Sequence, residues 1–192
     1  YTMMTIVETK CSPQKKYLLK TFNFNCFLSK HQKIIAETFY RISCNKQEYL
    51  LCYKKYSFSS LQSNFYPTFL MRDISTETLE NSFKNPEFQA KWKVKDIMKC
   101  LFAVSEGLLF LHNHLICHGN LCPSNIIIDE AKQSYLVDFG LYPIKKLYMT
   151  NDEIFNKEYK DPNTNESNIS FSNDVYSYGI LIIQFHLVFS GL

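Results

Sequence analysis

The stretch that decides the fold of this chain is HGNLCPSN at residues 118–125, together with the tripeptide DFG at residues 138–140. Between them lie two apolar runs that are too short for helices and are separated by polar residues 129–132. This pattern predicts a tight β-hairpin. Such a hairpin would bring Asn125 and Asp138, at the inner ends of the two motifs, to one site.

Two long helices are expected on either side of these motifs. From Lys93 onward, apolar residues recur at steps of three and four, which indicates a helix buried along one face. The apolar positions are Ile97, Leu101, Val104, Leu108 and Leu111. A second apolar stretch, 175–189, follows the N-cap residue types at 172–174 and predicts another helix. The polar stretch 145–173 breaks all periodicity and predicts an extended loop.

The N-terminal part of the chain has the composition of β-strands. Residues 1–9 and 17–22 flank turn-forming residues and predict one antiparallel hairpin. Two further apolar runs, 38–43 and 49–53, predict a second hairpin. Residues 54–92 mix serines, prolines and charges with weak helical signals, so we interpret them as a hinge and connector. The prediction is an α+β fold with a small β-rich N-terminal layer.

Composition indicates a globular protein without a polyanionic partner. Lys and Arg number 21 against 18 Asp and Glu, and this near balance gives no electrostatic reason to expect nucleic-acid binding. Hydrophobic residues make up 46% and aromatic residues 16% of the chain, enough for one packed core. Lys145 and Lys146, in the polar stretch, are expected to be a solvated loop face.

The cysteines bear on the cellular compartment. There are seven, without a C-x-x-C pair, and an odd number fits no self-contained disulfide framework. We therefore expect a reduced, intracellular and cytoplasmic setting, with Cys117 and Cys122 as small buried hydrophobic residues. The first ten residues lack the apolar block of a signal peptide, and the longest apolar stretch, 180–192, is too short to span a bilayer.

The two motifs resemble the catalytic loop H-R-D-L-x-P-x-N and the D-F-G metal motif of protein kinases. Lys20, on a strand after a hairpin, is similar to the phosphate-contacting lysine of that family. Residues 174–179 resemble the start of the helix that supports the family's catalytic loop. The resemblance implies a two-lobed protein kinase-like fold, incomplete at both ends. Without the last helices of the large lobe, apolar faces of 175–189 would be exposed.

The resemblance also implies domain boundaries and site residues. A partial N-lobe would span 1–53, the hinge and connector 54–92, and a partial C-lobe 93–192. The residues implied to contact ATP are Lys20, Tyr53, Asn125 and Asp138. Of these, Asn125 and Asp138 would also hold Mg²⁺, a hard cation that prefers oxygen ligands. Residues implied to be structural are His118, Phe139, Gly140 and Asp174.

Three positions in the catalytic loop depart from the family pattern. Asn120 stands where the family has the aspartate that accepts the substrate's hydroxyl proton, and a neutral amide cannot act as that base. Gly119 replaces an arginine that pairs with a phosphorylated activation loop. Cys122 replaces a lysine that contacts the transferred phosphate, so a positive charge is lost where negative charge develops. Each change removes a contribution to phosphoryl transfer.

A fourth departure concerns the partner of Lys20. Residues 21–36 contain no Asp or Glu, and the nearest acid, Glu37, is expected in a strand. The Lys–Glu ion pair of an active small lobe therefore has no local candidate. A glycine-rich phosphate loop is also absent from the sequence, and the A-P-E motif survives at best as DPN at residues 161–163.

These residues are compatible with two functions. The first is a pseudokinase that serves as a binding or scaffolding module for protein partners, with ATP and Mg²⁺ either retained or absent as cofactors. The second is a divergent active Ser/Thr protein kinase that transfers the γ-phosphate of ATP to protein hydroxyls, with positioning and metal charge compensating for Asn120.

A narrower resemblance rests on the short segment after Lys20 and on residues 43–48 and 139–142. Together these resemble the kinase-like domain of the TBC-domain-containing protein kinase-like proteins. That resemblance implies a downstream Rab-GTPase-activating-type domain and a role in endosomal trafficking.

Overall fold

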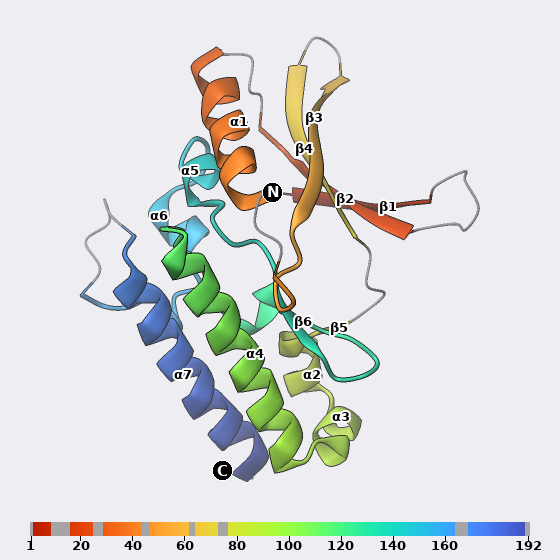
Figure 1. Ribbon diagram of the computed structural model, residues 1–192, viewed down its shortest axis with the longest axis vertical. Helices are drawn as coiled ribbons and strands as arrows, with labels where there is room; N and C mark the ends of the chain where they lie inside the picture. The colour runs from red at the N-terminus through yellow and green to blue at the C-terminus, as the bar shows by residue number, and fades with distance from the viewer. Residues whose placement is uncertain are drawn as a thin grey trace.

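A computed structural model of the chain describes residues 2–8, 16–24, 29–43, 47–61, 64–72, 77–163 and 169–190. The described residues form a β-rich upper part with one long helix and a mainly helical lower part (Figure 1). This arrangement agrees with the predicted α+β fold of two lobes.

The upper part is built on an antiparallel sheet with the strand order β1-β2-β4-β3. Its strands are β1 (Thr2–Glu8), β2 (Lys16–Phe22), β3 (Tyr53–Leu61) and β4 (Asn64–Arg72). The predicted hairpin of β1 and β2 is confirmed, with Met4 opposite Lys20. On its other edge β2 pairs with β4, where Phe69 is opposite Lys20. Lys20 is therefore fixed by strand pairing on both sides.

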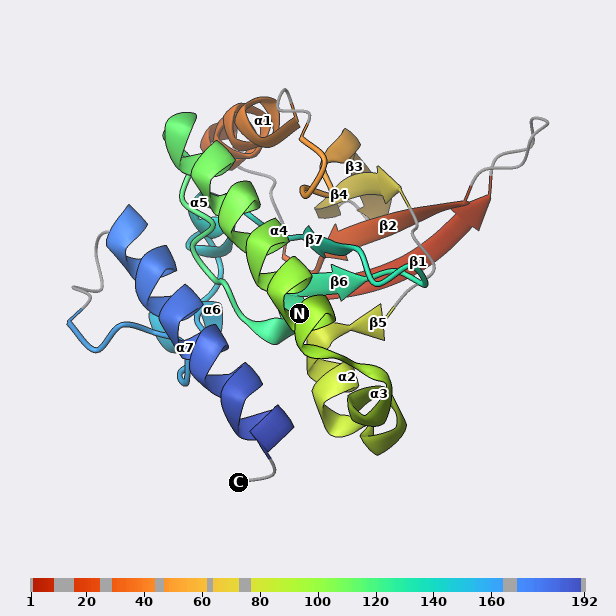
Figure 2. The same ribbon diagram turned by 60° about the horizontal axis from the view of Figure 1, so that its bottom comes forward.

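Helix α1 (Ser29–Ser43) stands beside this sheet and packs against β3 and the short helix α5 (Tyr142–Lys145) (Figure 2). Its buried side chains are Ile35, Thr38 and Ile42, at helical spacings of three and four. The predicted strand at 38–43 is thus wrong. The aromatic and β-branched content of that stretch favours a strand, but burial of one helical face against distant residues decides its structure.

The second predicted hairpin and much of the predicted connector are also wrong, because residues 53–61 and 64–72 form β3 and β4. The sheet therefore continues past residue 53, and the predicted hinge at Tyr53 lies at the start of a strand. Pro67 had argued against a strand here. It lies just outside the part of β4 that pairs with β2, so its missing N–H removes no bond from that ladder.

The lower part contains a small sheet of β5 (Glu77–Thr78), β6 (Ile126–Ile128) and β7 (Ser134–Leu136). The predicted hairpin of β6 and β7 is confirmed. The helices around it are α2 (Leu79–Lys84), α3 (Pro86–Lys91), α4 (Val94–Asn113), α6 (Asn151–Ile154) and α7 (Phe171–Ser190). Because α5 and α6 fall within or beside the stretch 145–173, that stretch is not wholly the extended loop that the sequence predicted.

Helix α4 confirms the predicted amphipathic helix and positions the β6–β7 hairpin. Of the predicted stripe, Val104, Leu108 and Leu111 are buried. A Cβ atom at Gly107 would come within 2.8 Å of Leu136, so glycine allows β7 to pack closely on the helix. Leu136 in turn donates its N–H to the carbonyl oxygen of Tyr49 at 2.8 Å and accepts from the N–H of Leu51 at 3.0 Å. These bonds connect the hairpin to the chain entering β3.

Helix α7 begins one turn earlier than predicted. The side-chain oxygen of Asn173 accepts from the backbone N–H of Ser170 at 2.8 Å, so Asn173 stabilises the helix start from inside the first turn. Several apolar side chains on α7 are exposed, as predicted for residues 175–189. They are Val175, Ile182, Ile183 and Leu187. No helix within the described ranges is both long and apolar enough to cross a membrane.

Candidate active site

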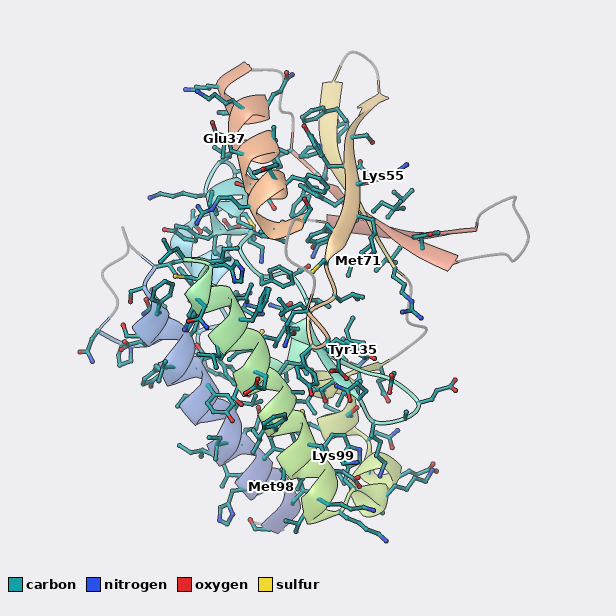
Figure 3. All side chains as sticks on the ribbon, viewed as in Figure 1. Glu37, Lys55, Met71, Met98, Lys99 and Tyr135 are labelled. Carbon is teal, nitrogen blue, oxygen red and sulfur yellow. The ribbon has the colours of Figure 1, made fainter. Side chains whose placement is uncertain are left out.

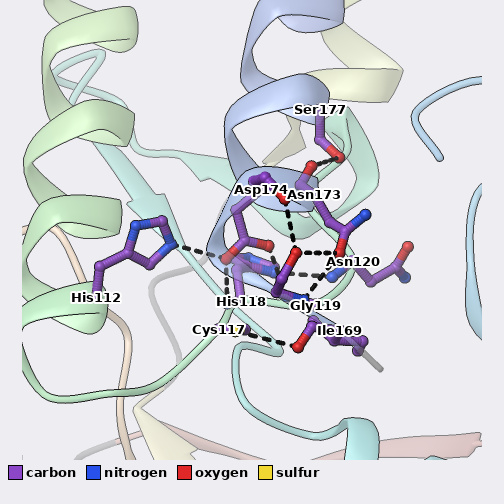
Figure 4. Close-up of polar contacts among 11 residues, drawn as sticks. His112, Cys117, His118, Gly119, Asn120, Ile169, Asn173, Asp174 and Ser177 are labelled. Carbon is purple, nitrogen blue, oxygen red and sulfur yellow. Dashed lines mark hydrogen bonds and ion pairs between the residues drawn. The ribbon is translucent and has the colours of Figure 1, made fainter. Parts of the chain in front are cut away.

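Asp174 anchors the catalytic-loop residues to α7 (Figure 4). One carboxylate oxygen accepts from the N–H of His118 at 2.7 Å and lies 2.9 Å from Nε2 of His112, and the other accepts from the N–H of Gly119 at 2.9 Å. Asp174 is only 1% exposed, so these bonds satisfy a buried carboxylate. The first turn of α7 thereby sets the position of the catalytic loop.

Gly119 has a backbone conformation that suits glycine. Its φ of +79° lies in the left-handed region, and a Cβ atom would meet Ile169 at 3.0 Å. An arginine at position 119 would therefore change the local packing against Ile169 as well as the charge.

The side chain of Asn120 is engaged by the chain itself. Its amide oxygen accepts a hydrogen bond from the backbone N–H of Asn156 at 3.1 Å. The Asn120 carbonyl oxygen accepts from Nδ2 of Asn125 at 2.8 Å, which fixes the orientation of the Asn125 side chain. The residue at the base position is thus neutral and holds the polypeptide that follows α6.

His118 is a buried, neutral histidine. It is 1% exposed, and burial lowers its pKa to about 4, against the opposing influence of the carboxylates of Asp174 and Asp138. Its Nε2 atom has no hydrogen-bond partner among the described residues. A neutral ring in this place fits the structural role expected of His118.

Asp138 receives a protein donor on each of its carboxylate oxygens. Lys20 forms an ion pair with Oδ2, and the hydroxyl of Tyr53 donates to Oδ1 at 2.7 Å. Burial alone would raise the pKa of Asp138, but the charges of Lys20 and Lys145 and the two hydrogen bonds outweigh it and hold this pKa well below its usual range. Each carboxylate oxygen of Asp138 therefore already has one partner within the chain.

The backbone of the second motif is joined to that of the first. Val137 donates its N–H to the carbonyl oxygen of Asn125 at 3.0 Å, and Gly140 donates to that of His118 at 3.1 Å. The predicted meeting of the two motifs at one site is confirmed by these bonds. The tight turn that makes it possible uses positive φ angles at Asp138 (61°) and Gly140 (68°).

Phe139 and Gly140 connect the site to α1. Phe139 is fully buried in the core. A Cβ atom at Gly140 would lie 2.7 Å from Ile42, so only glycine permits this approach of the helix. Beside Gly140 is a cavity of about 220 Å³ between α1, the residues before the catalytic loop and the start of α5.

Tyr53 is part of the site, but in a different place from the one predicted. It begins β3, is 1% exposed, and packs on Phe69 with ring centroids 5.1 Å apart. Burial, followed by the charge of Asp138, raises the pKa of its hydroxyl, which therefore stays a hydrogen-bond donor at neutral pH. The prediction that Tyr53 lies in a hinge is wrong, because Tyr53 begins β3 and its hydroxyl bonds to Asp138.

Glu37 does not supply the missing partner of Lys20. It lies in α1, contrary to the predicted strand, and points away from the sheet (Figure 3). Its side chain is 63% exposed and pairs with Lys33, whose Nζ lies 3.8 Å from Oε1. The helix that follows the strand of Lys20 thus does contain a glutamate, and Lys20 is bound to Asp138.

Cys122 and Cys117 are neutral thiols beside the catalytic loop. Cys122 is 1% exposed, its Sγ lies 3.1 Å from Oγ of Ser124, and burial raises its pKa. Burial also raises the pKa of Cys117 to about 11. Neither thiol supplies the charge that a lysine at position 122 would bring.

Lys145 is a site residue that the sequence interpretation missed. It is half-buried, whereas Lys146 is exposed as predicted. Helix α5 turns it inward, with the Lys145 N–H donating to the carbonyl oxygen of Leu141 at 3.0 Å. Burial lowers the pKa of its ammonium group and Lys20 lowers it further, while Asp138 opposes both. The available signal was Pro143, since proline favours the first turn of a helix.

Tyr148 brings the same segment against the upper part. Its ring stacks on Phe24, with centroids 4.1 Å apart and an angle of 11° between the planes, and meets Phe22 edge-on at 6.3 Å. Its hydroxyl is buried without a hydrogen-bond partner in the part of the chain that the structure describes. Tyr148 thus packs the segment after α5 against the end of β2 and the residues that follow it.

The arrangement does not fit a divalent metal ion. Both oxygens of Asp138 already accept from Lys20 and Tyr53, and two ammonium groups lie close by. The described residues also contain no group of three or more His, Cys, Asp or Glu side chains that could hold a metal. Mg²⁺ would have to compete with these two donors for the oxygens of Asp138.

Comparison with known proteins gives a match along nearly the whole chain. Residues 6–190 match the family model described as protein kinase domain. The LRR receptor-like serine/threonine-protein kinase ERECTA of Arabidopsis thaliana is 26% identical over 150 residues, which are 74% of this chain and 15% of that protein. Phytosulfokine receptor 1 of the same plant is 31% identical over 101 residues, 49% of this chain and 10% of that protein. The chain thus spans a small part of the relatives it matches.

Proposed function

Because this chain belongs to the protein kinase family, we propose that it is a kinase-like domain that has lost phosphoryl transfer and works as a binding module for protein partners. The observation that carries this proposal is the state of Asn120. A general base must hold a lone pair within reach of the substrate's hydroxyl proton. The Asn120 oxygen instead accepts from the backbone of Asn156, and an amide has no proton-accepting strength at neutral pH.

The charges around the site support the same proposal. Phosphoryl transfer depends on positioning and on cations that stabilise the charge developing on the phosphate. Cys122 is a buried neutral thiol, and Lys20 is paired with the acid that should bind metal. Three parts of the transfer machinery are thus missing or otherwise engaged.

A test is the transfer of labelled γ-phosphate from ATP, in the presence of Mg²⁺, to the chain itself and to a mixed Ser/Thr peptide substrate. We expect incorporation at the level of a no-enzyme control. Turnover that disappears in an Asp138→Ala variant would show that the chain is catalytic and would overturn the proposal.

A second candidate function is a divergent active Ser/Thr kinase. It is favoured by the hydrogen bond from Asn125 Nδ2 to the Asn120 carbonyl oxygen and by the anchoring of the loop on Asp174, because both keep the motif residues in order. The relatives named above include a serine/threonine-protein kinase by its printed name. Under this candidate, Asn120→Asp raises the transfer rate.

The narrower resemblance to the TBC-domain-containing protein kinase-like proteins stays a proposal. It would give the partner class of the module through a Rab-GTPase-activating-type domain on the same polypeptide. A chain in which that domain follows residue 192 would support it, and a different following domain would contradict it.

A further inference from the structure

The outward face of α4 carries a second apolar stripe, separate from the one that packs into the core. Figure 1 shows α4 at the front of the molecule, with no other helix or strand drawn across it. On this face Met98, Phe102 and Leu109 are 59%, 56% and 54% exposed, and Ser105 lies between the last two. We call these four residues the outer stripe. A helix that is apolar on two faces is typical of one that packs against a second partner.

The spacing of the outer stripe is that of a helix-pairing seam. From Met98 its residues follow at steps of four, three and four, the repeat that keeps a seam facing a partner helix. Ser105 is small, and its hydroxyl already donates to the carbonyl oxygen of Phe102 at 2.8 Å. Tyr49 meets the Phe102 ring edge-on, with centroids 6.1 Å apart, and restricts its orientation. The stripe thus offers a large ring next to a small residue, a combination suited to knobs-into-holes packing.

Two opposite charges flank the outer stripe on one side. Lys99 is exposed on the lower half of α4 (Figure 3), and Glu106 is half-buried further along the helix. Each follows a residue of the stripe by one position, so both lie on the same flank. Two helical turns, about 10 Å, separate them. Neither forms an ion pair with another residue that the structure describes.

The outer stripe is complementary to itself in an antiparallel register. When Phe102 of one copy lies opposite Ser105 of a second copy, the same register places Met98 opposite Leu109. Each large or long side chain then faces a smaller or similar one, and a twofold axis between the two helices repeats both contacts.

The charges select this antiparallel direction. In an antiparallel helix pair the same flank of each helix faces that of the other, so Lys99 of one copy faces Glu106 of the second copy, and the twofold axis repeats the contact. Val94 and Leu101 lie on the opposite flank and carry no charge. A parallel pair would bring opposite flanks together and leave both ions facing apolar side chains.

We propose that the outer stripe of α4 binds a second copy of this chain as an antiparallel helix pair, in which Lys99 and Glu106 form two reciprocal ion pairs. A single helix pair is smaller than the interface of roughly 1,600 Å² of standard complexes, so the dimer is weak, with a dissociation constant on the order of 10 µM. None of these side chains belongs to the candidate active site, and the pairing does not depend on the proposed function.

Sedimentation equilibrium of the full chain, at concentrations from about 1 to 200 µM, measures the association. We expect an equilibrium between monomer and dimer. A chain that stays monomeric over the whole range, or one that forms open-ended aggregates, would overturn the proposal. Phosphate transfer does not enter this measurement, so failure here is distinguishable from failure of the proposed function.

Charge reversal on the flank tests the register. Lys99→Glu and Glu106→Lys each create two like-charge contacts across the axis, and each alone should weaken the dimer about tenfold. The double variant restores opposite charges and should return to within about threefold of the parent chain. An equimolar mixture of the two single variants should form a heterodimer, because all its flanking contacts are again between opposite charges. Additive losses in the double variant, or no heterodimer, would contradict the antiparallel register.

A matched pair of apolar substitutions tests which helix makes the contact. Phe102→Asp should weaken the dimer at least about tenfold. Ile183→Asp changes a residue of α7 that is 54% exposed, and it should alter the dissociation constant by less than about twofold. Circular dichroism and thermal unfolding check that both variants are folded. Equal effects of the two substitutions would place the contact outside the outer stripe and overturn the assignment.

Discussion

The amide oxygen of Asn120 accepts a hydrogen bond from the backbone N–H of Asn156, at 3.1 Å. This bond connects the position of the family's catalytic base to the segment that follows α6. An aspartate in the same place could accept the same bond, since it depends only on an oxygen atom at that position. The geometry therefore predicts how the site responds to a restored carboxylate.

Asn120→Asp is expected to leave phosphoryl transfer at background. The new carboxylate can keep the bond to Asn156, and Cys122 still contributes no cation. Transfer of labelled phosphate from ATP, with and without Mg²⁺, measures this. A rise of about 100-fold, the usual contribution of a general base, would favour the active-kinase candidate instead.

Asp174→Ala is expected to lower the free energy of unfolding by about 3 kcal/mol, because it leaves the buried N–H groups of His118 and Gly119 without an acceptor. Urea denaturation measures the change. Asp174→Asn keeps one side-chain oxygen and should cost less. Glu130→Ala, at an exposed position, is the control and should stay within about 0.5 kcal/mol of the parent chain.

Gly140→Ala is expected to destabilise the chain by about 2 kcal/mol, since the added Cβ would lie 2.7 Å from Ile42 and the residue has a φ of +68°. Gly179→Ala is the matched comparison. A Cβ there meets nothing within 4 Å, and alanine is the better helix former in α7 by about 1 kcal/mol. Opposite changes in melting temperature are the expected result, and equal losses would contradict the close approach of α1 to Gly140.

His118 should make the chain less stable as pH is lowered from 6.5 to about 4. Burial lowers the pKa of this histidine from 6.5 to about 4 in the folded state. The fold favours the neutral ring, so this contribution is complete above the unfolded pKa and is lost as pH falls through the folded pKa. The loss across that window is about 3 kcal/mol.

Urea denaturation of the parent chain and of His118→Gln at several pH values measures this contribution. The variant should show the shallower dependence on pH. His114→Gln changes an exposed histidine at the end of α4 and is the control. Parallel profiles for the parent chain and His118→Gln would show that another group causes the pH dependence.

Local sequence patterns predicted the parts of the fold that depend on neighbouring residues. The stripe of α4 and the β6–β7 hairpin follow from spacings of three, four and two, which burial of one face enforces within a single element. The same reasoning failed for α1, where Phe39 and Tyr40 favour a strand but contact with β3 and α5 makes the segment a helix. It failed again for β3 and β4, because Pro67 and the serines are residue types typical of loops.

Local sequence patterns likewise predicted some parts of the candidate site and missed others. Motif spacing was enough to bring Asn125 and Asp138 together, because the hairpin between them is short. The partners of Asp138 could not be found from spacing, since Lys20 and Tyr53 lie 118 and 85 residues away along the chain. Lys145 was missed because a lysine in a polar stretch has no signal of burial.

By itself the sequence determined the protein kinase family of this chain and the presence of Asn120 and Cys122 in its motif, because these depend on residue identity in an ordered motif. The tertiary structure alone decided that both oxygens of Asp138 are taken by Lys20 and Tyr53, and that Lys145 brings a second cation to the site. The reason is physical: electrostatic interactions act between groups that are close in space, and the fold brings these groups together from separate elements.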